Sequence, residues 1–483
     1  MVQDRRIKTG VAGLDSIMGG GFPGAHLYLV RGAAGTGKTT LALQFLREGA
    51  ANGEPVLYVS LSQSEAELRQ IASSHGWDLD GITIQSLISG DEATQLSEQT
   101  IFQTSDLRLD RTRDAIENIV RRVNPRRVVY DSLLEVRLLA SDKVRFRREV
   151  LGFKNFLADE DTAALLLDTE HAVDDISDNQ LENIAHGLIR LEKQLPQYGS
   201  ARRRIEIKKM RGTAIADGYH DISIREGTGV TVYPRIVPDV KEEFGLGDDL
   251  IRSNIAELDK MLGGGLDAGT TSLFVGQSGT GKSTLASLYV EAALRRGEVV
   301  GMFLFEERRE TFFRRCEGLG INLRKYYDSG QLMLRDFTPT EVSPGEFAAI
   351  ARSAIEEHDA GVIVIDSFTG YISSLPESVE AITQMHSLLK YIARRGVLTL
   401  LIVAQHGLLG HQQTTDLDVS FLGDSVLLLR MYERPGVIRR TVTVVKKRHG
   451  PHDLNVHELF IDGSGVRIEP FSPPVDVSSI SRQ

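Results

Sequence analysis

The sequence predicts an α/β protein with two similar domains, each built on a mostly parallel sheet that helices cover on both faces. Three observations predict this fold class. The pattern G-x-x-x-x-G-K-[ST] occurs twice, at residues 32–39 and 276–283. Similar residues flank both copies at one offset, since Lys282 follows Lys38 by 244 residues. Apolar stretches alternate with amphipathic ones after each copy, as expected for strands that alternate with helices.

The overall composition sets limits on size and compartment. At 483 residues the chain exceeds one ordinary core, so we expect two or three domains. The formal charge of −10 gives no support to whole-chain electrostatic binding of nucleic acid. The strongest apolar run, residues 397–404, is too short to span a bilayer. With one cysteine, Cys316, and no signal-peptide pattern at the start, we expect a cytoplasmic protein with no membrane partner.

Each glycine-rich copy has the setting of a phosphate-binding loop (P-loop). Residues 271–275 form a plausible strand before the second copy, and residues 284–293 a helix after it. Glycines let backbone N–H groups surround phosphate oxygens at a helix N-terminus, and the lysine reaches the β- and γ-phosphates. A chance match is negligible with two complete copies. The expected nucleotide-binding residues are Gly35, Thr36, Gly37, Lys38, Thr39, Thr40, Gly279, Thr280, Gly281, Lys282, Ser283 and Thr284.

The alternation can be followed element by element. In the first half we expect strands at 56–60, 127–130 and 163–167, with helices at 65–74 and 113–122. In the second half we expect strands at 299–305, 362–365 and 398–404, with helices at 346–357 and 380–395. We predict a first domain at 1–236, a linker at 237–248, a second domain at 249–470 and a flexible tail at 471–483.

Two aspartates are candidates for a magnesium site. Asp131 and Asp366 each end an apolar strand at a similar distance after a P-loop. Turn formation is the alternative for a single aspartate, but the repeated placement favours a metal role. Together with the P-loop hydroxyls of Thr39 and Ser283, they would serve Mg²⁺.

The two halves differ in their candidate catalytic carboxylates. Glu306 and Glu307 follow the strand at 299–305, where one of them could polarise the water that attacks the γ-phosphate. The alternative is a pair of solvated glutamates at a helix start. The same offset places Ser62 and Gln63 in the first half, and neither can act as a carboxylate base. We therefore predict that the first domain binds nucleotide and hydrolyses it poorly.

Basic residues recur late in each half. Lys209 and Arg211 follow the β-type segment 204–208, and Lys446 and Arg448 follow the segment 441–445. Such cations could neutralise a transferring phosphoryl group, although position alone favours edge-strand cations that discourage aggregation. The arginines at 202–204 lack interleaved aromatic residues and are interpreted as a solvated face.

These motifs together resemble the KaiC and KaiC-like family of tandem RecA-like ATPases, relatives of the circadian clock protein kinases. The resemblance extends from Gly10 to about residue 470. It rests on both P-loops, on the L-D-x-x-x-G-G-G leader before each, on Phe305-Glu306-Glu307 and on the segment K-M-R-G-T at 209–213. A P-loop alone indicates only an NTPase, whereas the duplicated set is highly specific.

The resemblance implies two RecA-like P-loop NTPase domains in a double-ring homohexamer, with ATP between neighbouring subunits. Glu306 and Glu307 match the family's catalytic glutamates. The cations that match residues reaching the ATP of the adjacent subunit are Lys209, Arg211, Lys446 and Arg448. This match replaces the edge-strand interpretation.

The resemblance also bears on autophosphorylation. Clock proteins of the family phosphorylate a neighbouring Ser-Thr pair in the second domain, with a further Thr upstream. Here Ser420 and the upstream Thr415 are retained, but Phe421 stands in the second position of the pair. Single-site phosphorylation of Ser420 or Thr415 is compatible with this sequence, whereas the ordered two-site cycle is not expected. Together with Ser62 and Gln63, this departure indicates a relative outside the clock proper.

Three functions compete at this point. The leading one is an ATP- and Mg²⁺-dependent signalling hexamer whose protein partners are unidentified. A DNA-associated RecA-type ATPase is the runner-up, but the loop at 405–413 carries no Arg or Lys for phosphate contacts, so a nucleic-acid partner is not expected. A nucleotide-gated scaffold without turnover is disfavoured by Glu306 and Glu307.

Overall fold

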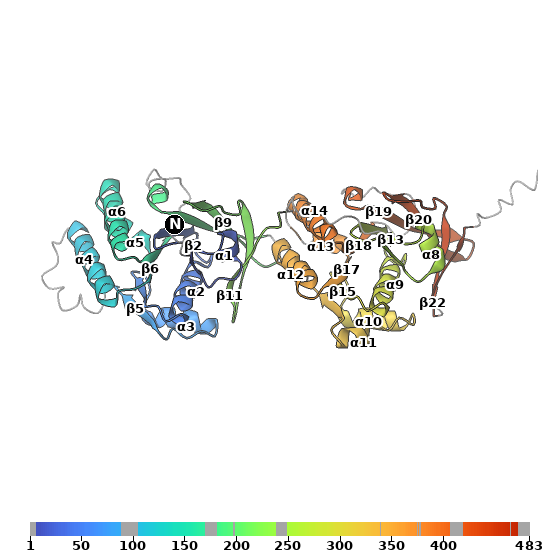
Figure 1. Ribbon diagram of the computed structural model, residues 1–483, viewed down its shortest axis with the longest axis horizontal. Coiled ribbons are helices and arrows are strands. Elements are labelled where there is room, and N and C mark those ends of the chain that lie inside the picture. Colours follow the sequence, from blue (N-terminus) through green and yellow to red (C-terminus); the bar gives the residue numbers. More distant parts are fainter. Residues whose placement is uncertain are drawn as a thin grey trace, which may run out of the picture. The chain divides into compact units, whose positions relative to one another are not determined.

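The computed structural model describes residues 6–87, 105–169, 181–196, 199–237, 249–338, 340–373, 375, 378–405, 419–463 and 465–471. The chain divides into two compact units, Met1–Arg235 and Ile236–Gln483, which we refer to as the first and second domains (Figure 1). The expected linker lies outside the described residues except for Val237, and the expected tail except for Phe471.

The first domain contains a sheet with nine described strands in the order β11-β10-β9-β8-β3-β7-β6-β4-β5. Neighbours from β8 to β5 run parallel, and those from β8 to β11 run antiparallel. The strands are β3 (Leu27–Gly32), β4 (Val56–Ser60), β5 (Ile82–Ser86), β6 (Arg127–Asp131), β7 (Ala163–Thr169), β8 (Gly187–Gln194), β9 (Arg202–Met210), β10 (Tyr219–Arg225) and β11 (Gly229–Tyr233).

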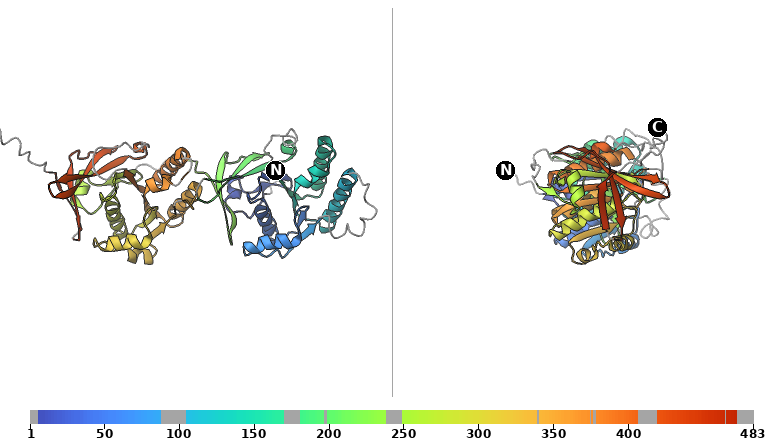
Figure 2. Two further views of the ribbon diagram at one scale, coloured as in Figure 1. Left: turned by 180° about the vertical axis from the view of Figure 1, so that it is seen from behind. Right: turned by 90° about the vertical axis from the view of Figure 1, so that its right-hand side faces the viewer.

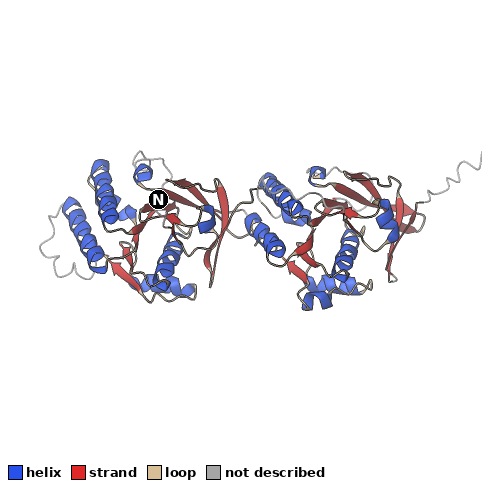
Figure 3. Cartoon of the chain, in the orientation of Figure 1, coloured by secondary structure: helices blue, strands red, loops and turns tan. Residues whose placement is uncertain are grey.

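Helices cover both faces of this sheet (Figure 3). One apolar core includes residues of α1 to α3, and a second includes residues of α4 to α6. The helix bounds are α1 (Leu14–Ile17), α2 (Lys38–Ala51), α3 (Glu65–Ser74), α4 (Ser105–Val123), α5 (Leu133–Leu139) and α6 (Lys143–Asp159).

The second domain repeats this topology, with nine described strands in the order β16-β15-β17-β18-β14-β19-β20-β21-β22. Its neighbours from β16 to β19 run parallel, and those from β19 to β22 run antiparallel. The strands are β14 (Thr271–Gln277), β15 (Val299–Leu304), β16 (Leu332–Asp336), β17 (Ala360–Asp366), β18 (Leu398–Gln405), β19 (Ser425–Arg434), β20 (Val437–Lys447), β21 (His457–Asp462) and β22 (Gly465–Pro470).

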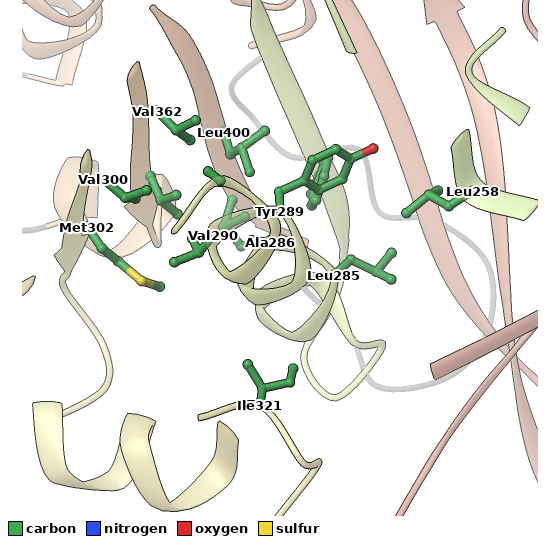
Figure 4. Packing of buried hydrophobic residues seen from close by; sticks show 14 of the residues in the cluster. Leu258, Leu285, Ala286, Tyr289, Val290, Val300, Met302, Ile321, Val362 and Leu400 are labelled. Atoms are coloured by element: carbon green, nitrogen blue, oxygen red, sulfur yellow. The ribbon is translucent and has the colours of Figure 1, made fainter. Parts of the chain in front are cut away.

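The second domain also has two cores, one on each face of its sheet. On one face α9 packs Leu285, Tyr289 and Val290 against Met302 and Leu400 of the strands (Figure 4). On the other face α12 to α14 enclose an aromatic-rich core. The helix bounds are α8 (Ala256–Met261), α9 (Lys282–Arg295), α10 (Arg309–Glu317), α11 (Arg324–Asp328), α12 (Pro344–Glu356), α13 (Phe368–Ser373), α14 (Ser378–Arg394) and a 3₁₀ turn η2 (Ser420–Leu422).

The repeated leader before each P-loop has a structural explanation. Asp15 Oδ1 accepts from the backbone N–H of Thr9 at 3.0 Å and from its hydroxyl at 2.8 Å. Asp259 Oδ1 accepts the same two bonds from Ser253, both at 2.8 Å. These bonds tie α1 and α8 to the short antiparallel pairs β1 (Arg6–Ile7) with β2 (Phe22–Pro23) and β12 (Leu250–Ile251) with β13 (Leu266–Asp267).

The predicted fold class is confirmed, and the same layers appear in both domains from a second direction (Figure 2). The helix predicted at 65–74 is found with those bounds, and the helix predicted at 113–122 begins earlier, at Ser105. The single cysteine, Cys316, is fully buried. The antiparallel strands were anticipated only as two β-type segments. Both segments lie in strands with a neighbour on each side, β9 and β20, whose registers pair Lys209 with Leu188 of β8 and Lys446 with Val426 of β19.

Candidate nucleotide site

The two P-loops connect β3 to α2 and β14 to α9 at the carboxyl ends of their strands. The helix N-caps Gly37 and Gly281 have φ of 105° and 102°, and no side chain caps either helix. A Cβ on these glycines would lie 2.5 Å from Ile224 Cδ1 and 2.4 Å from Ile461 Cδ1. Only glycine fits there, and the uncapped N–H groups of the first turn suit a bound anion.

Internal hydrogen bonds link the residues of each loop. Thr36 Oγ1 donates to Ala33 O at 2.9 Å, and Thr280 Oγ1 donates to Gln277 O at 2.8 Å. Lys38 Nζ donates to Gly32 O at 2.6 Å, and Lys282 Nζ donates to Gln277 O at 2.7 Å. The structure therefore gathers the expected loop residues into two similar groups, with Gly35, Thr39, Thr40, Gly279, Ser283 and Thr284 as their other members.

An arginine from the antiparallel part of each sheet supports the P-loop. Arg440 Nε donates to Gly279 O at 2.9 Å, and Arg203 Nε donates to Gly35 O at 3.4 Å. Residues 202–204, interpreted from the sequence as a solvated face, are half-buried, and Arg203 contacts the P-loop. Since 161 or more residues separate the partners along the chain, no local motif signals this contact.

The second domain brings Asp366 beside the P-loop helix. Asp366 is 8% exposed at the end of β17. Burial raises the pKa of Asp366, opposed by a hydrogen bond from Ser283. Burial also lowers the pKa of Lys282, opposed by the negative charges of Asp366 and Glu306. A buried carboxylate bonded to the P-loop hydroxyl is a donor set that fits Mg²⁺, which takes few protein ligands and completes its shell with phosphates and water.

Glu306 is held at this same edge of the sheet. The preceding residue, Phe305, is buried against Phe347 and Tyr371, and its N–H donates to Asp366 O at 2.6 Å. Ser367 Oγ donates to Glu306 Oε1 at 2.5 Å. The packing of the Phe305 ring and the hydrogen bond from Ser367 therefore fix the position of the Glu306 carboxylate relative to Lys282.

Glu307 has a different partner. Arg315 of α10 contacts both of its carboxylate oxygens, with Nε–Oε1 at 3.2 Å and Nη2–Oε2 at 2.8 Å. Both side chains are about one quarter exposed. This two-point contact fixes the orientation of Glu307. Sequence reasoning missed Arg315, because its position two helical turns later carries no motif of its own.

The surroundings of Asp131 differ from those of Asp366, because Tyr58 places a hydroxyl beside Asp131 where the second domain has the apolar side chain of Met302. Leu61 N–H donates to Asp131 O at 2.7 Å, the same bond that Phe305 makes to Asp366, so Ser62 and Gln63 take the places of Glu306 and Glu307. Tyr58, at the place of Met302, donates its hydroxyl to Asp131 Oδ2 at 2.6 Å. The Thr39 hydroxyl is bonded to Tyr58 as well.

The pKa of Asp131 is shifted in the same direction as that of Asp366. Burial raises the pKa of Asp131, opposed by the Tyr58 bond and by Lys38. Burial and the neighbouring Asp131 charge raise the pKa of Tyr58 well above its ordinary value, so its hydroxyl keeps the proton that it donates. The pair of Thr39 and Asp131 therefore also fits Mg²⁺, with Tyr58 as an additional contact.

The four late cations lie at equivalent positions at the ends of β9 and β20 and just after them. Lys209 Nζ donates to Glu182 O at 2.6 Å and Ala185 O at 3.0 Å. Lys446 Nζ donates to Gly423 O at 2.6 Å and Ser420 O at 3.1 Å. Each lysine thus binds the segment, called its loop below, that precedes the neighbouring strand: residues 181–186 before β8, helical at 181–184, and residues 420–424 before β19, which include η2. Burial, the largest effect, lowers the pKa of Lys209.

The arginines and the candidate phosphosites lie on or near the same loops. Arg211 Nη2 donates to Asn183 O at 2.8 Å, and Arg448 pairs with Asp424 at 3.5 Å. Ser420 is exposed at the start of η2. Thr415 lies outside the described residues, as does the loop at 405–413 except for Gln405.

Both halves of the chain match one protein family. The family model for the KaiC ATPase matches residues 7–236 and again residues 251–472. The chain belongs to the KaiC family of ATPases. The resemblance inferred from the motifs is confirmed, and so is the tandem RecA-like architecture.

Curated relatives of the KaiC family cover nearly the whole chain. The circadian clock protein KaiC3 of Synechocystis sp. (strain PCC 6803) is 28% identical over 471 residues, which are 96% of this chain and 92% of the relative. The circadian clock oscillator protein KaiC of Prochlorococcus marinus (strain MED4) is 27% identical over 474 residues, or 97% and 91% of the two chains. In the part of the chain that the structure describes, no helix has the length and apolar composition needed to cross a bilayer.

Proposed function

We propose that the second domain of this KaiC-family ATPase carries out ATP hydrolysis, whereas the first domain binds ATP and turns it over slowly. One observation carries the proposal. Glu306 and Glu307 lie beside the P-loop and Asp366 in the second domain, and Ser62 and Gln63 occupy their places in the first.

The residues of the second domain account for the steps of hydrolysis. The loop N–H groups and Lys282 hold the β- and γ-phosphates in line with an attacking water. Glu306 takes a proton from this water as its oxygen bonds to the γ-phosphorus and the bond to the bridging oxygen breaks, releasing ADP and phosphate. Ser367 keeps Oε1 of Glu306 in place, so we assign Oε2 to the water.

Two further groups support this chemistry. Mg²⁺, when bound through Ser283 and near Asp366, neutralises charge on the β- and γ-phosphates. Arg315 holds Glu307 in a fixed orientation. In the first domain no carboxylate of this kind follows Leu61, so water is not activated there.

We further propose that the subunits assemble into a homohexamer in which Lys209, Arg211, Lys446 and Arg448 contact the ATP of the adjacent subunit. Their equivalent positions on β9 and β20 and in the turns that follow support one shared role. The assembly would be a cytoplasmic signalling protein that binds protein partners according to its nucleotide state. Sedimentation velocity with ATP and with ADP tests the assembly, and a monomer under both conditions would refute it.

The division of labour is tested by paired substitutions in the full chain. Lys282→Ala and Glu306→Gln should each lower steady-state turnover by about 100-fold or more, because phosphate contacts or the general base are lost. Lys38→Ala should retain most of the turnover. Loss of all turnover with Lys38→Ala alone would contradict the proposal.

Autophosphorylation is the second activity that we propose for the second domain, at Ser420 or Thr415. Ser420 is exposed and lies on the loop that Lys446 binds. Incubation with γ-labelled ATP followed by peptide mapping should place the label on one of these residues and remove it with Ser420→Ala or Thr415→Val. A chain that hydrolyses ATP without any label would be an ATPase alone.

A further inference from the structure

The first domain contains a group of four charged side chains next to its P-loop, which we refer to as the ionic cluster: Arg31 and Asp168, which are buried, and Arg137 and Glu182, which are partly exposed. Arg31 is the last residue of β3 before the P-loop glycine Gly32, and its Nε and Nη2 contact Asp168 Oδ2 at 3.2 and 3.1 Å. Arg31 Nη1 contacts Glu182 Oε1 at 3.0 Å, and Arg137 of α5 contacts Asp168 Oδ2 at 3.4 Å. Asp168 is fully buried, and Arg31 is 6% exposed.

The second domain has the same fold with no charge at these four positions. Arg31 pairs with Asp168 across β3 and β7, just as Val275 pairs with Val403 across β14 and β18. Arg137 and Ile372 each stand six residues after the strand-ending aspartate. Glu182 corresponds to Ser420, because Lys209 and Lys446 bind the carbonyls of these two residues.

The ionic cluster is therefore not required for the fold, and its geometry is poor for stability. Burying charges carries a desolvation penalty that hydrophobic replacements avoid. Among the described residues, Asp168 Oδ1 is buried without a hydrogen-bond partner, which adds to that penalty. The advantage of the cluster must then lie in where it holds its members.

What the cluster holds is the loop that binds Lys209. The carboxylate of Glu182 is attached to Arg31, and its backbone carbonyl accepts the bond from Lys209 Nζ at 2.6 Å. A short series of contacts thus leads from the strand that enters the first P-loop to the amine of Lys209. The loop of Lys446 has no charged anchor at the corresponding positions.

We infer that the ionic cluster is a positioning device that fixes Lys209 relative to the first P-loop. Arg31 and Glu182 act as positioning residues through the loop carbonyls. The inference rests on the proposed function only where it assigns Lys209 to the ATP of an adjacent subunit. The first domain would then present Lys209 in one position through side chains that the second domain lacks, whereas the segment of Lys446 is tied to β14 by Asp424, which accepts from the backbone N–H of Thr271 at 3.0 Å.

The first test is chemical labelling of lysines in the full, nucleotide-free chain, read by peptide mass spectrometry. Glu182→Gln should raise the reductive-methylation rate of Lys209 about tenfold, the effect of losing one partly buried charge-assisted bond. Lys446 in the same sample should be unchanged and serves as the internal reference. Glu192→Gln, which removes a carboxylate from the neighbouring strand, should leave both rates unchanged.

A second variant uses the residues that the second domain itself supplies. Arg31→Val, Arg137→Ile, Asp168→Val and Glu182→Ser together should keep the melting temperature near that of the wild type and raise Lys209 labelling at least as much. An unchanged labelling rate of Lys209 in folded Glu182→Gln would overturn the inference.

The functional half of the inference is tested by ATP-dependent association in light scattering. Glu182→Gln should weaken association about tenfold. Normal association despite faster Lys209 labelling would refute the positioning role. If the wild-type chain does not associate with ATP, the proposed assembly fails, and the labelling experiment still decides whether the cluster fixes Lys209.

Discussion

Replacing Gly370 with alanine should impair hydrolysis while leaving the fold intact. Gly370 lies in α13, directly beneath the candidate base. A Cβ there would lie 2.9 Å from Glu306 Cγ, 3.1 Å from Glu306 Oε1 and 3.2 Å from Ser367 Oγ. Since carbon atoms pack at about 3.5–4.0 Å, the Glu306 side chain must withdraw by roughly 0.6–1 Å.

The size of the effect follows from this displacement. The bond from Ser367 to Glu306 is lost or lengthened, and a shift of about 1 Å at a catalytic group lowers turnover by about 100-fold. The backbone tolerates the change, because alanine in a helix is favoured over glycine by about 0.5–1 kcal/mol. Gly370→Ala should therefore lower the turnover of ATP and raise the stability of the chain.

Steady-state ATP hydrolysis and thermal unfolding of the full chain measure the two quantities. Gly152→Ala is the matched control, since Gly152 lies within helix α6 and a Cβ there would meet nothing within 4 Å. We expect wild-type turnover for this control. A Gly370→Ala chain with turnover within twofold of the wild type would show that the observed place of Glu306 is not needed for hydrolysis.

Three more predictions concern single side chains. Arg315→Lys should lower turnover about tenfold at unchanged melting temperature, since lysine cannot bridge both oxygens of a carboxylate; unchanged turnover would remove Arg315 from the site. Gly263→Ala should destabilise the second domain by about 3 kcal/mol in urea, because φ is +68° and a carbonyl would lie 2.2 Å from the new Cβ. Gly297→Ala, with a φ of +93° and open space, should lose only about 1 kcal/mol. Burial, His26 and nearby cations lower the pKa of His186 from 6.5 to about 4. The unfolded chain therefore binds a proton at His186 more readily than the folded chain does. The stability of the first domain should fall as the pH drops from about 6.5 to about 4. The fluorescence of Trp77, the single tryptophan, reports this unfolding, and a His186→Gln chain with the same pH dependence would contradict the assignment.

The sequence was sufficient for the parts of the site that local backbone geometry dictates. A P-loop needs its glycines, its lysine and its hydroxyl at fixed spacing, so both copies could be located without a structure. Asp131 and Asp366 were found because a buried apolar strand has a clear end. The repeat then aligned Ser62 and Gln63 with the glutamates, which exposed the difference between the halves.

Contacts between distant residues could not be predicted in this way. Tyr58 and Asp131 lie 73 residues apart and meet because β4 and β6 are adjacent in register. Arg31 and Asp168 meet across β3 and β7 at a separation of 137 residues. Charged residues inside strands were the available signal, since a buried charge requires a partner, but the sequence does not say which partner.

The support of each P-loop by the antiparallel strands has a practical consequence for dissecting the molecule. Arg440 and Ile461 come from β20 and β21, long after the parallel strands that carry the loop and the aspartate. A fragment that ends after β19 would keep the P-loop, Asp366 and both glutamates and lose the contacts that shape the loop. Fragments intended to bind nucleotide should therefore run through Tyr233 for the first domain and through Pro470 for the second.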